Sequence, residues 1–343
     1  MLQGETMVLS RFQLSDIELA TENFAATYCI GLDTERKVYK ADLDHFGNSI
    51  SSSTEGMNNG EPSKKHITVA IKCIINSESG RGGKQAFFEE LEMRTSYKHP
   101  NIVSLIGFCY EVDKMILVYE HASKSSLDDY LKSVDSMKNF TWTQRLHMCL
   151  EIARGLNHLH TSPQRIIHGD IKSANILLGM NHEAKIAYFG ISKHPTNQEV
   201  GMKVYADPEY ETTGNLETHS DVYSFGVVLF EIFCGRVAYH PVYMKDKEKG
   251  LAPLARKCFN DGSIERIIDP KLIEETDEDV LTSNRGPNND SLYTFLKVAC
   301  QCTGEAANRP TMEMVINELE LALNFHVSHY FLLFVFLITC FNF

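Results

Sequence analysis

The spacing of hydrophobic positions changes partway along the chain. Up to about residue 121, short runs rich in β-branched residues favour strands, and the clearest of these runs are Lys37–Lys40, Ile67–Ile75 and Met115–Glu120. After Ser123 the apolar positions recur at helical spacing, most clearly in Trp142–His160 and Ser220–Cys234. The pattern predicts an α+β, bilobal arrangement, in which a small β-rich lobe precedes a larger helical lobe. The crevice between such lobes is the default ligand site.

Two helices are expected within the β-rich part. The segment Phe12–Phe24 has an amphipathic pattern, with Ser15 as the predicted N-cap and Glu18 completing a capping box. The segment Lys84–Tyr97 contains neither glycine nor proline and is also predicted to be helical.

Composition shifts divide the chain into four parts. These are an N-terminal extension with a helix (1–24), a β-rich lobe (25–121) that contains a low-complexity loop (42–66), a helical lobe (122–324) and an apolar tail (325–343). An acidic run at 274–279 is predicted to be a solvated loop.

The tail is strongly apolar from Tyr330 to Phe341. As a helix, this stretch reaches about 18 Å, which is short of a hydrocarbon core of about 30 Å. Three interpretations of residues 327–343 stay open: packing on the domain, an imperfect gene-model terminus, and a membrane tail anchor with Cys340 acylated.

Bulk composition narrows the class of protein. The 343 residues are 43% hydrophobic, as in a globular protein, and the formal net charge of -12 argues against nucleic acid as a partner. The nine cysteines lack metal-site spacing, which favours reduced thiols. The N-terminal residues Met1–Thr6 lack the basic and apolar pattern of a signal peptide, and Leu2 excludes N-myristoylation. We therefore expect a cytoplasmic protein, with membrane contact only through the tail.

Three short motifs carry a resemblance to a known family. Val69–Lys72 reads V-A-I-K, His168–Asp170 reads H-G-D where relatives have H-R-D, and Tyr188–Gly190 reads Y-F-G where relatives have D-F-G. The chain resembles the kinase domain of plant receptor-like and receptor-like cytoplasmic kinases over roughly Phe12–Leu323. The resemblance implies the bilobal protein-kinase fold.

The resemblance also assigns roles to individual residues. Lys72 would hold the α- and β-phosphates of ATP while pairing with Glu90, Asp170 would accept the proton of a substrate hydroxyl, and Lys172 is typical of Ser/Thr kinases. The implied nucleotide-binding residues are Ile30, Gly31, Val38, Ala70, Lys72, Glu90, Tyr119, Glu120, Ala122, Asn175 and Leu177. Among these, Val38, Ala70 and Leu177 would enclose adenine, and Tyr119 is the gatekeeper. Plain core packing also explains the apolar members of the set.

Other positions depart from the pattern in ways that weaken nucleotide chemistry. Of the three glycines expected in the glycine-rich loop, only Gly31 is present. Asp33 and Glu35 add negative charge where the triphosphate would lie. Asn175 is an implied metal ligand, but Tyr188 replaces the second one. A neutral phenol is a poor Mg²⁺ ligand, so the sequence implies ATP as the cofactor and makes Mg²⁺ doubtful. Loss of this ligand predicts a rate lower by about 10³-fold or more.

Two further departures concern switching. Gly169 replaces the arginine that reads a phosphorylated activation loop, so activation by that route should be lost. Arg94 lies one turn after Glu90, and we hypothesise that it competes with Lys72 for Glu90 and holds the helix in an inactive pose. A solvent-facing Arg94 is the alternative.

The residues that position the substrate differ from the family pattern, whereas the residues that support the fold match it. Met202 and Val204 displace the usual threonine and glycine of the region that positions the substrate hydroxyl. By contrast, Glu209 and Arg309 match a buried ion pair of the family, and Asp221 matches the aspartate that braces the catalytic loop.

The sequence thus favours a pseudokinase of the receptor-like kinase family, a signalling module that binds ATP weakly and docks on other protein kinases or receptors. The alternative is a low-activity Ser/Thr kinase that transfers the γ-phosphate of ATP to protein hydroxyls through Asp170, Lys72 and one metal on Asn175. A third hypothesis is a pure interaction protein with an empty pocket. Whether the chain is an enzyme stays open at this point.

Overall fold

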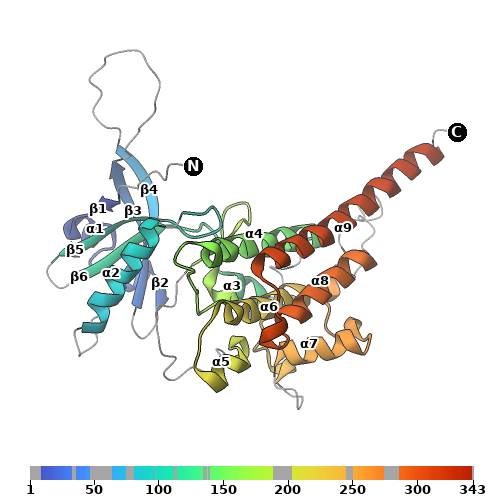
Figure 1. Ribbon diagram of the computed structural model, residues 1–343. Helices are drawn as coiled ribbons and strands as arrows, with labels where there is room; N and C mark the ends of the chain where they lie inside the picture. The colour runs from blue at the N-terminus through green and yellow to red at the C-terminus, as the bar shows by residue number, and fades with distance from the viewer. Residues whose placement is uncertain are drawn as a thin grey trace. The chain divides into compact units, whose positions relative to one another are not determined.

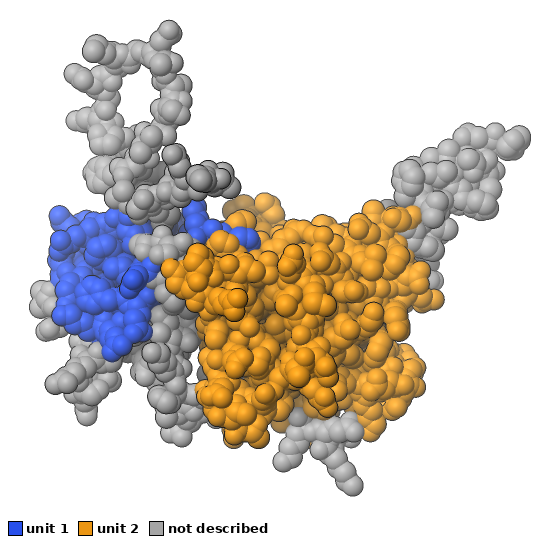
Figure 2. All heavy atoms as spheres, viewed as in Figure 1, with its two compact units in different colours: residues 1–99, 103–122 blue, residues 100–102, 123–343 orange. Residues whose placement is uncertain are grey.

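A computed structural model describes residues 9–32, 36–46, 64–74, 81–96, 98–111, 114–133, 137, 140–187, 203–244, 250–273 and 286–341. The chain forms two compact units, shown in blue and orange in Figure 2. Unit 1 consists of residues 1–99 and 103–122, and unit 2 of residues 100–102 and 123–343.

Unit 1 is built on a six-stranded sheet in the order β1-β5-β6-β4-β3-β2 (Figure 1). Its strands are β1 (Ser10–Arg11), β2 (Cys29–Leu32), β3 (Arg36–Phe46), β4 (Lys64–Ile74), β5 (Leu105–Glu111) and β6 (Lys114–Glu120). All neighbours are antiparallel except β1 and β5, which pair in parallel. The β-branched residues Val69 and Ile71 of β4 and Val118 of β6 are fully buried, so the two central strands form the core of the sheet.

Strands β3 and β4 are longer than the sequence predicts. Residues 42–46 and 64–66, expected within a loop, extend the two strands and continue their pairing as far as Phe46 opposite Lys64. Alternation explains the extension, because Ala41 and Leu43 turn into the core while Asp42 and Asp44 stay exposed. The remainder of that predicted loop, including 48–60, lies outside the described residues.

Helices α1 (Leu14–Ala20) and α2 (Arg81–Ser96) complete unit 1 with the short η1 (Ala26–Tyr28). The predicted capping box of α1 is wrong, because Gln13 is the N-cap and Ser15 lies inside the helix. The Gln13 side chain makes no capping hydrogen bond. The fully buried Ile17 anchors α1 in the core, which outweighs the missing cap. Thr21 ends the helix, since its hydroxyl donates to the carbonyl of Ile17 and accepts from the Phe24 amide.

Unit 2 is mainly helical. Its elements are α3 (Leu127–Lys132), α4 (Trp142–Thr161), η3 (Ser173–Asn175), β7 (Ile176–Leu178), β8 (Ala184–Ile186), η4 (Lys203–Tyr205), α5 (Pro208–Thr213), α6 (Thr218–Cys234), η5 (Pro241–Tyr243), α7 (Leu251–Asn260), η6 (Ile264–Arg266), η7 (Pro270–Leu272), α8 (Asn289–Cys302), η9 (Ala306–Asn308) and α9 (Met312–Phe341). Strands β7 and β8 form a two-stranded sheet. The predicted α+β arrangement is confirmed, with a β-sheet unit and a helical unit.

Two predicted helices form the centre of unit 2. Helix α4 begins at a capping box made by Thr141 and Gln144. Helix α6 is buried along most of its length, as its continuous apolar sequence requires. The Trp142 indole donates to the Ser291 hydroxyl at 2.8 Å and packs edge-on against Phe295, which fixes α4 to α8.

Helix α9 runs without interruption across the predicted boundary between helical lobe and tail at residue 325. Its first half packs on α4 and α8, where Val315, Leu319 and Ala322 are buried. Within the part of the chain that is described, none of the helices combines the length and apolarity needed to span a bilayer. The side chains from residue 329 onward lie outside the described set, and the three interpretations of the tail stay open.

Candidate functional site

The position of Lys72 on β4 decides the direction in which its side chain points. Side chains alternate between faces along a strand, so Val69 and Ile71 turn into the core cluster and Lys72 turns to the opposite face. On the neighbouring strand β6, Leu117 lies opposite Lys72. Tyr119, two residues further along, therefore shares a face with Lys72.

Glu90, on α2, pairs with Lys72. The Lys72 Nζ lies 2.5 Å from Glu90 Oε2, and the two side chains are only 3% and 6% exposed. The structure thus brings together the two residues that the resemblance pairs. Removing either partner would leave a buried charge without its counter-ion, which is costly.

Tyr119 has a second role that the sequence did not reveal. Its hydroxyl donates to Glu90 Oε1, so each oxygen of that carboxylate has a partner within unit 1. A tyrosine in the otherwise aliphatic run of β6 is the signal that could have indicated a buried polar contact. Lys72 holds the Glu90 carboxylate here, and the hypothesis that Arg94 competes with Lys72 for Glu90 stays a prediction. The Arg94 side chain lies outside the described residues.

The remaining nucleotide-binding candidates are divided between the units. Unit 1 contains Ile30, Gly31, Val38, Ala70, Glu120 and Ala122, and unit 2 contains Asn175 and Leu177. Val38 is buried and lies opposite Lys72 in the sheet, whereas Ile30 is 53% exposed. A Cβ on Gly31 would meet Val38 at an ordinary 3.6 Å, so nothing in the described structure demands glycine there. Asp33 and Glu35 lie outside the described residues.

The catalytic loop of unit 2, residues 168–175, is internally bonded. Lys172 Nζ lies 2.9 Å from Asp170 Oδ2, and Asn175 Nδ2 donates to the Asp170 carboxylate at 2.8 Å and to its backbone carbonyl at 2.7 Å. The Asp170 side chain is 38% exposed, so its carboxylate can reach a ligand. These contacts hold Asp170 as a general base would need to be held.

Asp221, on α6, braces this loop through its backbone amides. Its carboxylate accepts from the amides of His168 and Gly169, both at 2.8 Å, and contacts His160 Nε2 at 2.9 Å. Gly169 has a φ of 75°, in the left-handed region that glycine adopts without strain. Gly169 therefore lacks the arginine side chain found here in relatives, and its backbone conformation suits the turn that Asp221 holds.

His168 ties the loop to the strand that leads to Tyr188. Its ring Nε2 lies 3.1 Å from the Ala187 carbonyl, and the Ala187 amide donates to the carbonyl of Asn175 at 2.8 Å. The residue before Tyr188 is thus fastened to the catalytic loop on both sides. Tyr188 itself lies outside the described residues, as do Met202 and the acidic run 274–279.

The donor set at this loop fits Mg²⁺ poorly. Asn175 offers a neutral carbonyl oxygen, Asp170 is already paired with Lys172, and the next expected ligand position carries the phenol of Tyr188. Magnesium prefers one or two carboxylates together with phosphate and water. Among the described residues, moreover, no group of three acidic, histidine or cysteine side chains could hold a metal ion.

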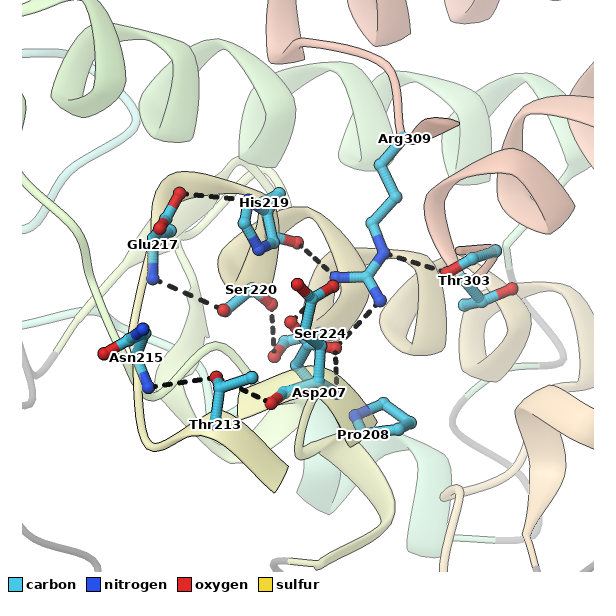
Figure 3. Close-up of polar contacts among 12 residues, drawn as sticks. Asp207, Pro208, Thr213, Asn215, Glu217, His219, Ser220, Ser224, Thr303 and Arg309 are labelled. Carbon is cyan, nitrogen blue, oxygen red and sulfur yellow. Dashed lines mark hydrogen bonds and ion pairs between the residues drawn. The ribbon is translucent and has the colours of Figure 1, made fainter. Parts of the chain in front are cut away.

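Arg309 is paired differently from the prediction (Figure 3). Its guanidinium makes two 2.8 Å bonds to the carboxylate of Asp207, whereas Glu209, the predicted partner, is exposed. Asp207 rather than Glu209 pairs with Arg309 because Asp207 is the N-cap of α5, where its carboxylate also accepts from the Glu209 amide. Burial pushes the pKa of Asp207 up, but the bonds from Arg309 and from that amide outweigh it and hold the pKa below its ordinary value.

A second buried cluster, not predicted from the sequence, lies beside the catalytic loop. The Tyr205 hydroxyl donates to Glu231 Oε1 at 2.5 Å and lies 3.0 Å from the Ser173 hydroxyl. Ser173 Oγ and the Ala238 amide reach the same carboxylate oxygen at 3.2 and 2.7 Å. Burial raises the pKa of Glu231 to about 8. A lone glutamate inside the apolar sequence of α6 is the signal that could have revealed this cluster.

Comparison with known proteins agrees with these observations. A family model described as protein tyrosine and serine/threonine kinase matches residues 44–319. In Arabidopsis thaliana, the receptor-like protein kinases ANXUR2 and HERK 1 are 36% and 35% identical to the chain, over 91% of its length. A probable receptor-like protein kinase of the same plant is 39% identical over 79% of the chain. The chain spans about a third of the length of each of these relatives, since the matches cover 34%, 35% and 32% of them.

Proposed function

Because the chain belongs to the protein tyrosine and serine/threonine kinase family, and is similar within it to plant receptor-like kinases, we propose that it is a pseudokinase signalling module. It binds ATP weakly and acts by docking on partner kinases or receptors. The observation that carries the proposal is the phenol of Tyr188 at the position where a kinase holds its metal, next to the fastened Ala187. The family generally uses ATP with Mg²⁺, so loss of the charged metal ligand lowers phosphoryl transfer more than it lowers ATP binding.

The residues that remain support nucleotide binding without catalysis. Lys72 is buried, paired and directed away from the core, so its charge is available to a phosphate without any rearrangement of α2. Glu90 is held by Lys72 and Tyr119 together. Binding of ATP therefore depends on Lys72 and not on a divalent cation.

A thermal-shift measurement tests this statement. We expect ATP to raise the melting temperature equally with Mg²⁺ and with EDTA, and we expect Lys72→Met to abolish the rise. A rise that requires Mg²⁺ would contradict the proposal, and no rise at all would favour the empty-pocket hypothesis.

The low-activity Ser/Thr kinase is a second candidate, and the assembled catalytic loop favours it. Lys172 and Asn175 both bond to the Asp170 carboxylate, as a working loop requires. Transfer from radiolabelled ATP to a generic protein acceptor separates the two candidates, with Asp170→Asn as the matched control. We expect the wild type to give no more product than Asp170→Asn, and Tyr188→Asp to give more. Wild-type transfer that Asp170→Asn abolishes would establish the enzyme.

A further inference from the structure

Unit 2 contains a cavity of about 270 Å³ that shares no residue with the candidate nucleotide site. Its walls come from the end of α6, from η5, from α7 and from residues 264–270. The volume lies just below the range of about 300–1,000 Å³ that is usual for sites of drug-sized ligands. At about 30 Å³ for each water-sized group, it would hold roughly nine such groups.

The turn after α6 shapes one wall of the cavity. Cys234 ends the helix, and Gly235 follows with a φ of 64°, in the left-handed region. A Cβ at Gly235 would lie 2.4 Å from Asp269 Oδ2, so only glycine allows this close approach. The Asp269 amide donates to the Phe233 carbonyl at 3.2 Å, and the Asp269 carboxylate pairs with the buried Arg145 at 2.5 Å. The wall is therefore held from both sides, and the cavity is preformed.

The floor of the cavity is buried and uncharged. It consists of Cys234, Tyr243, Leu254, Ile267 and Ile268. Burial raises the pKa of the Cys234 thiol and of the Tyr243 hydroxyl, so both groups stay neutral at neutral pH. The floor therefore suits a hydrocarbon or aromatic body.

The rim of the cavity carries two guanidinium groups and one carboxylate, from Arg236, Arg266 and Glu265. The charge of Arg236 acts on the floor, because it opposes the rise in the pKa of both Cys234 and Tyr243. Neither arginine makes an ion pair within the part of the chain that the structure describes. The rim thus has a surplus of one positive charge, and Arg236 lies where it can direct that charge to a ligand on the floor.

The C-terminal end of α6 carries a partial negative charge, which disfavours an anion nearby. Two of its last carbonyl groups are already bonded, however. The Ile232 carbonyl accepts from Arg145 Nη1 at 2.8 Å, and the Phe233 carbonyl accepts from the Asp269 amide. These bonds reduce the unfavourable field of the helix end at the cavity.

We propose that this cavity binds a small amphipathic monocarboxylate. The carboxylate of the ligand pairs with Arg236 at the rim, and its hydrocarbon or aromatic body lies against the floor. A guanidinium group presents parallel donors that match the two oxygens of a carboxylate. Glu265, on the same rim, repels a second negative charge, so a monocarboxylate is favoured over a phosphate monoester. The site goes beyond the proposed function, since it uses neither Lys72 nor the catalytic loop.

Isothermal titration of the full chain at neutral pH tests the proposal. Octanoate is the probe, because it matches the cavity in size and carries a single carboxylate. Octanol and octylamine keep the hydrocarbon chain and replace the anion by a neutral and a cationic group. We expect octanoate to bind at one site, and the other two to bind about 10-fold or more weakly. Equal binding of the three compounds, or no binding of octanoate below its micellar concentration, would overturn the proposal.

Two substitutions locate the bound octanoate. Arg236→Gln removes the rim charge and is expected to weaken binding about 10-fold or more. Arg154→Gln is the matched control, because Arg154 is an exposed arginine of α4 that does not line the cavity. Val242 lines the cavity and is 43% exposed, so Val242→Trp fills the cavity without disturbing the core and should abolish binding. Melting temperatures without ligand check that each variant folds. Wild-type affinity in Arg236→Gln or in Val242→Trp would refute the assignment.

The ATP-binding variant separates this proposal from the proposed function. Lys72→Met is expected to lose the thermal shift with ATP and to bind octanoate as the wild type does. Loss of octanoate binding in Lys72→Met would mean that octanoate occupies the nucleotide site, which would also overturn the proposal. If ATP gives no thermal shift in the wild type, the octanoate titrations still decide the question of the cavity.

Discussion

The two units each contain a buried ion pair, and the pairs differ in the type of cation and in the partners shown around it. In unit 2, the Arg309 guanidinium donates hydrogen bonds to the Asp207 carboxylate and to the carbonyls of Gly304 and His219. It also lies over the ring of Tyr223. In unit 1, Lys72 is a compact ammonium group whose paired partner, Glu90, is shared with Tyr119. The first pair holds the fold together, and we propose the second as the group that binds phosphate.

This contrast shows where the chain tolerates change. The bracing residues Asp221, Asp207 and Arg309 are present and bonded, while a metal ligand and two loop glycines have been replaced. We propose that residues that hold the fold and residues that would hold a cation are separable in this chain. Measurements on the two pairs test that separation directly.

The largest effect is expected at the scaffold pair. Asp207→Ala leaves the Arg309 guanidinium buried without a carboxylate and removes the α5 cap, which should lower the free energy of unfolding by about 3–5 kcal/mol in urea titrations. Glu209→Ala is the control, because an exposed side chain should change it by about 0.5 kcal/mol or less. The opposite ranking would restore Glu209 as the partner of Arg309.

A smaller cost is expected at the binding pair. Lys72→Met leaves the Glu90 carboxylate with the Tyr119 hydroxyl, and the acid can take up a proton, so we expect a loss of about 2 kcal/mol in the same titration. Lys40→Met, on the exposed side of β3, is the matched control and should be near neutral. A loss as large as that of Asp207→Ala would mean that Lys72 is as much a scaffold residue as Arg309.

Glu231 adds a pH dependence to the scaffold. Its pKa is raised from 4.5 to about 8 by burial, so between those values the folded state binds more protons than the unfolded state. The protonated Glu231 therefore stabilises the fold fully below about pH 4.5. This stabilisation decreases as the pH rises and does not change further above about pH 8. Unfolding titrations from pH 6 to 8 should show Glu231→Gln losing about 2 kcal/mol less than the wild type. Parallel profiles would contradict the raised pKa.

The smallest effect concerns the catalytic-loop turn. Gly169→Ala places a Cβ at a φ of 75°, which should cost about 1 kcal/mol, and exchange in 168–175 should accelerate. Gly262→Ala is matched, because that glycine has a φ of 68° and open space around it. It should cost a similar amount without changing exchange in the catalytic loop. Equal exchange in both variants would mean that Gly169 serves the fold alone.

Sequence motifs predicted the parts of the site whose partners are fixed by strand and helix position. Lys72 and Glu90 were predicted as a pair because V-A-I-K fixes a strand and the downstream residues fix the helix register. Asp221 was predicted as a brace because the motif around it, Ser220–Gly226, matches that of the family. In these cases a residue's place on an element determines its contact.

Contacts decided by competition were not predictable. Asp207 and Glu209 are two residues apart and bear the same charge, and only the cap geometry of α5 decides which of them meets Arg309. Ser15 lost the capping role in α1 because burial of Ile17 set the helix boundaries. The bond between Tyr119 and Glu90 and the cluster around Glu231 join side chains from separate elements, which no local pattern specifies.

The parallel pairing of β1 with β5 has a practical consequence. Ser10 and Arg11 lie opposite Gly107 and Phe108, and the Ser10 carbonyl comes so close to Gly107 that an added Cβ would meet it at 2.1 Å. A recombinant version starting after Arg11 would uncover the β5 backbone and present an unpaired sheet edge. Self-association through that edge is the hazard to avoid, so fragments prepared for crystallisation should retain the residues before Phe12.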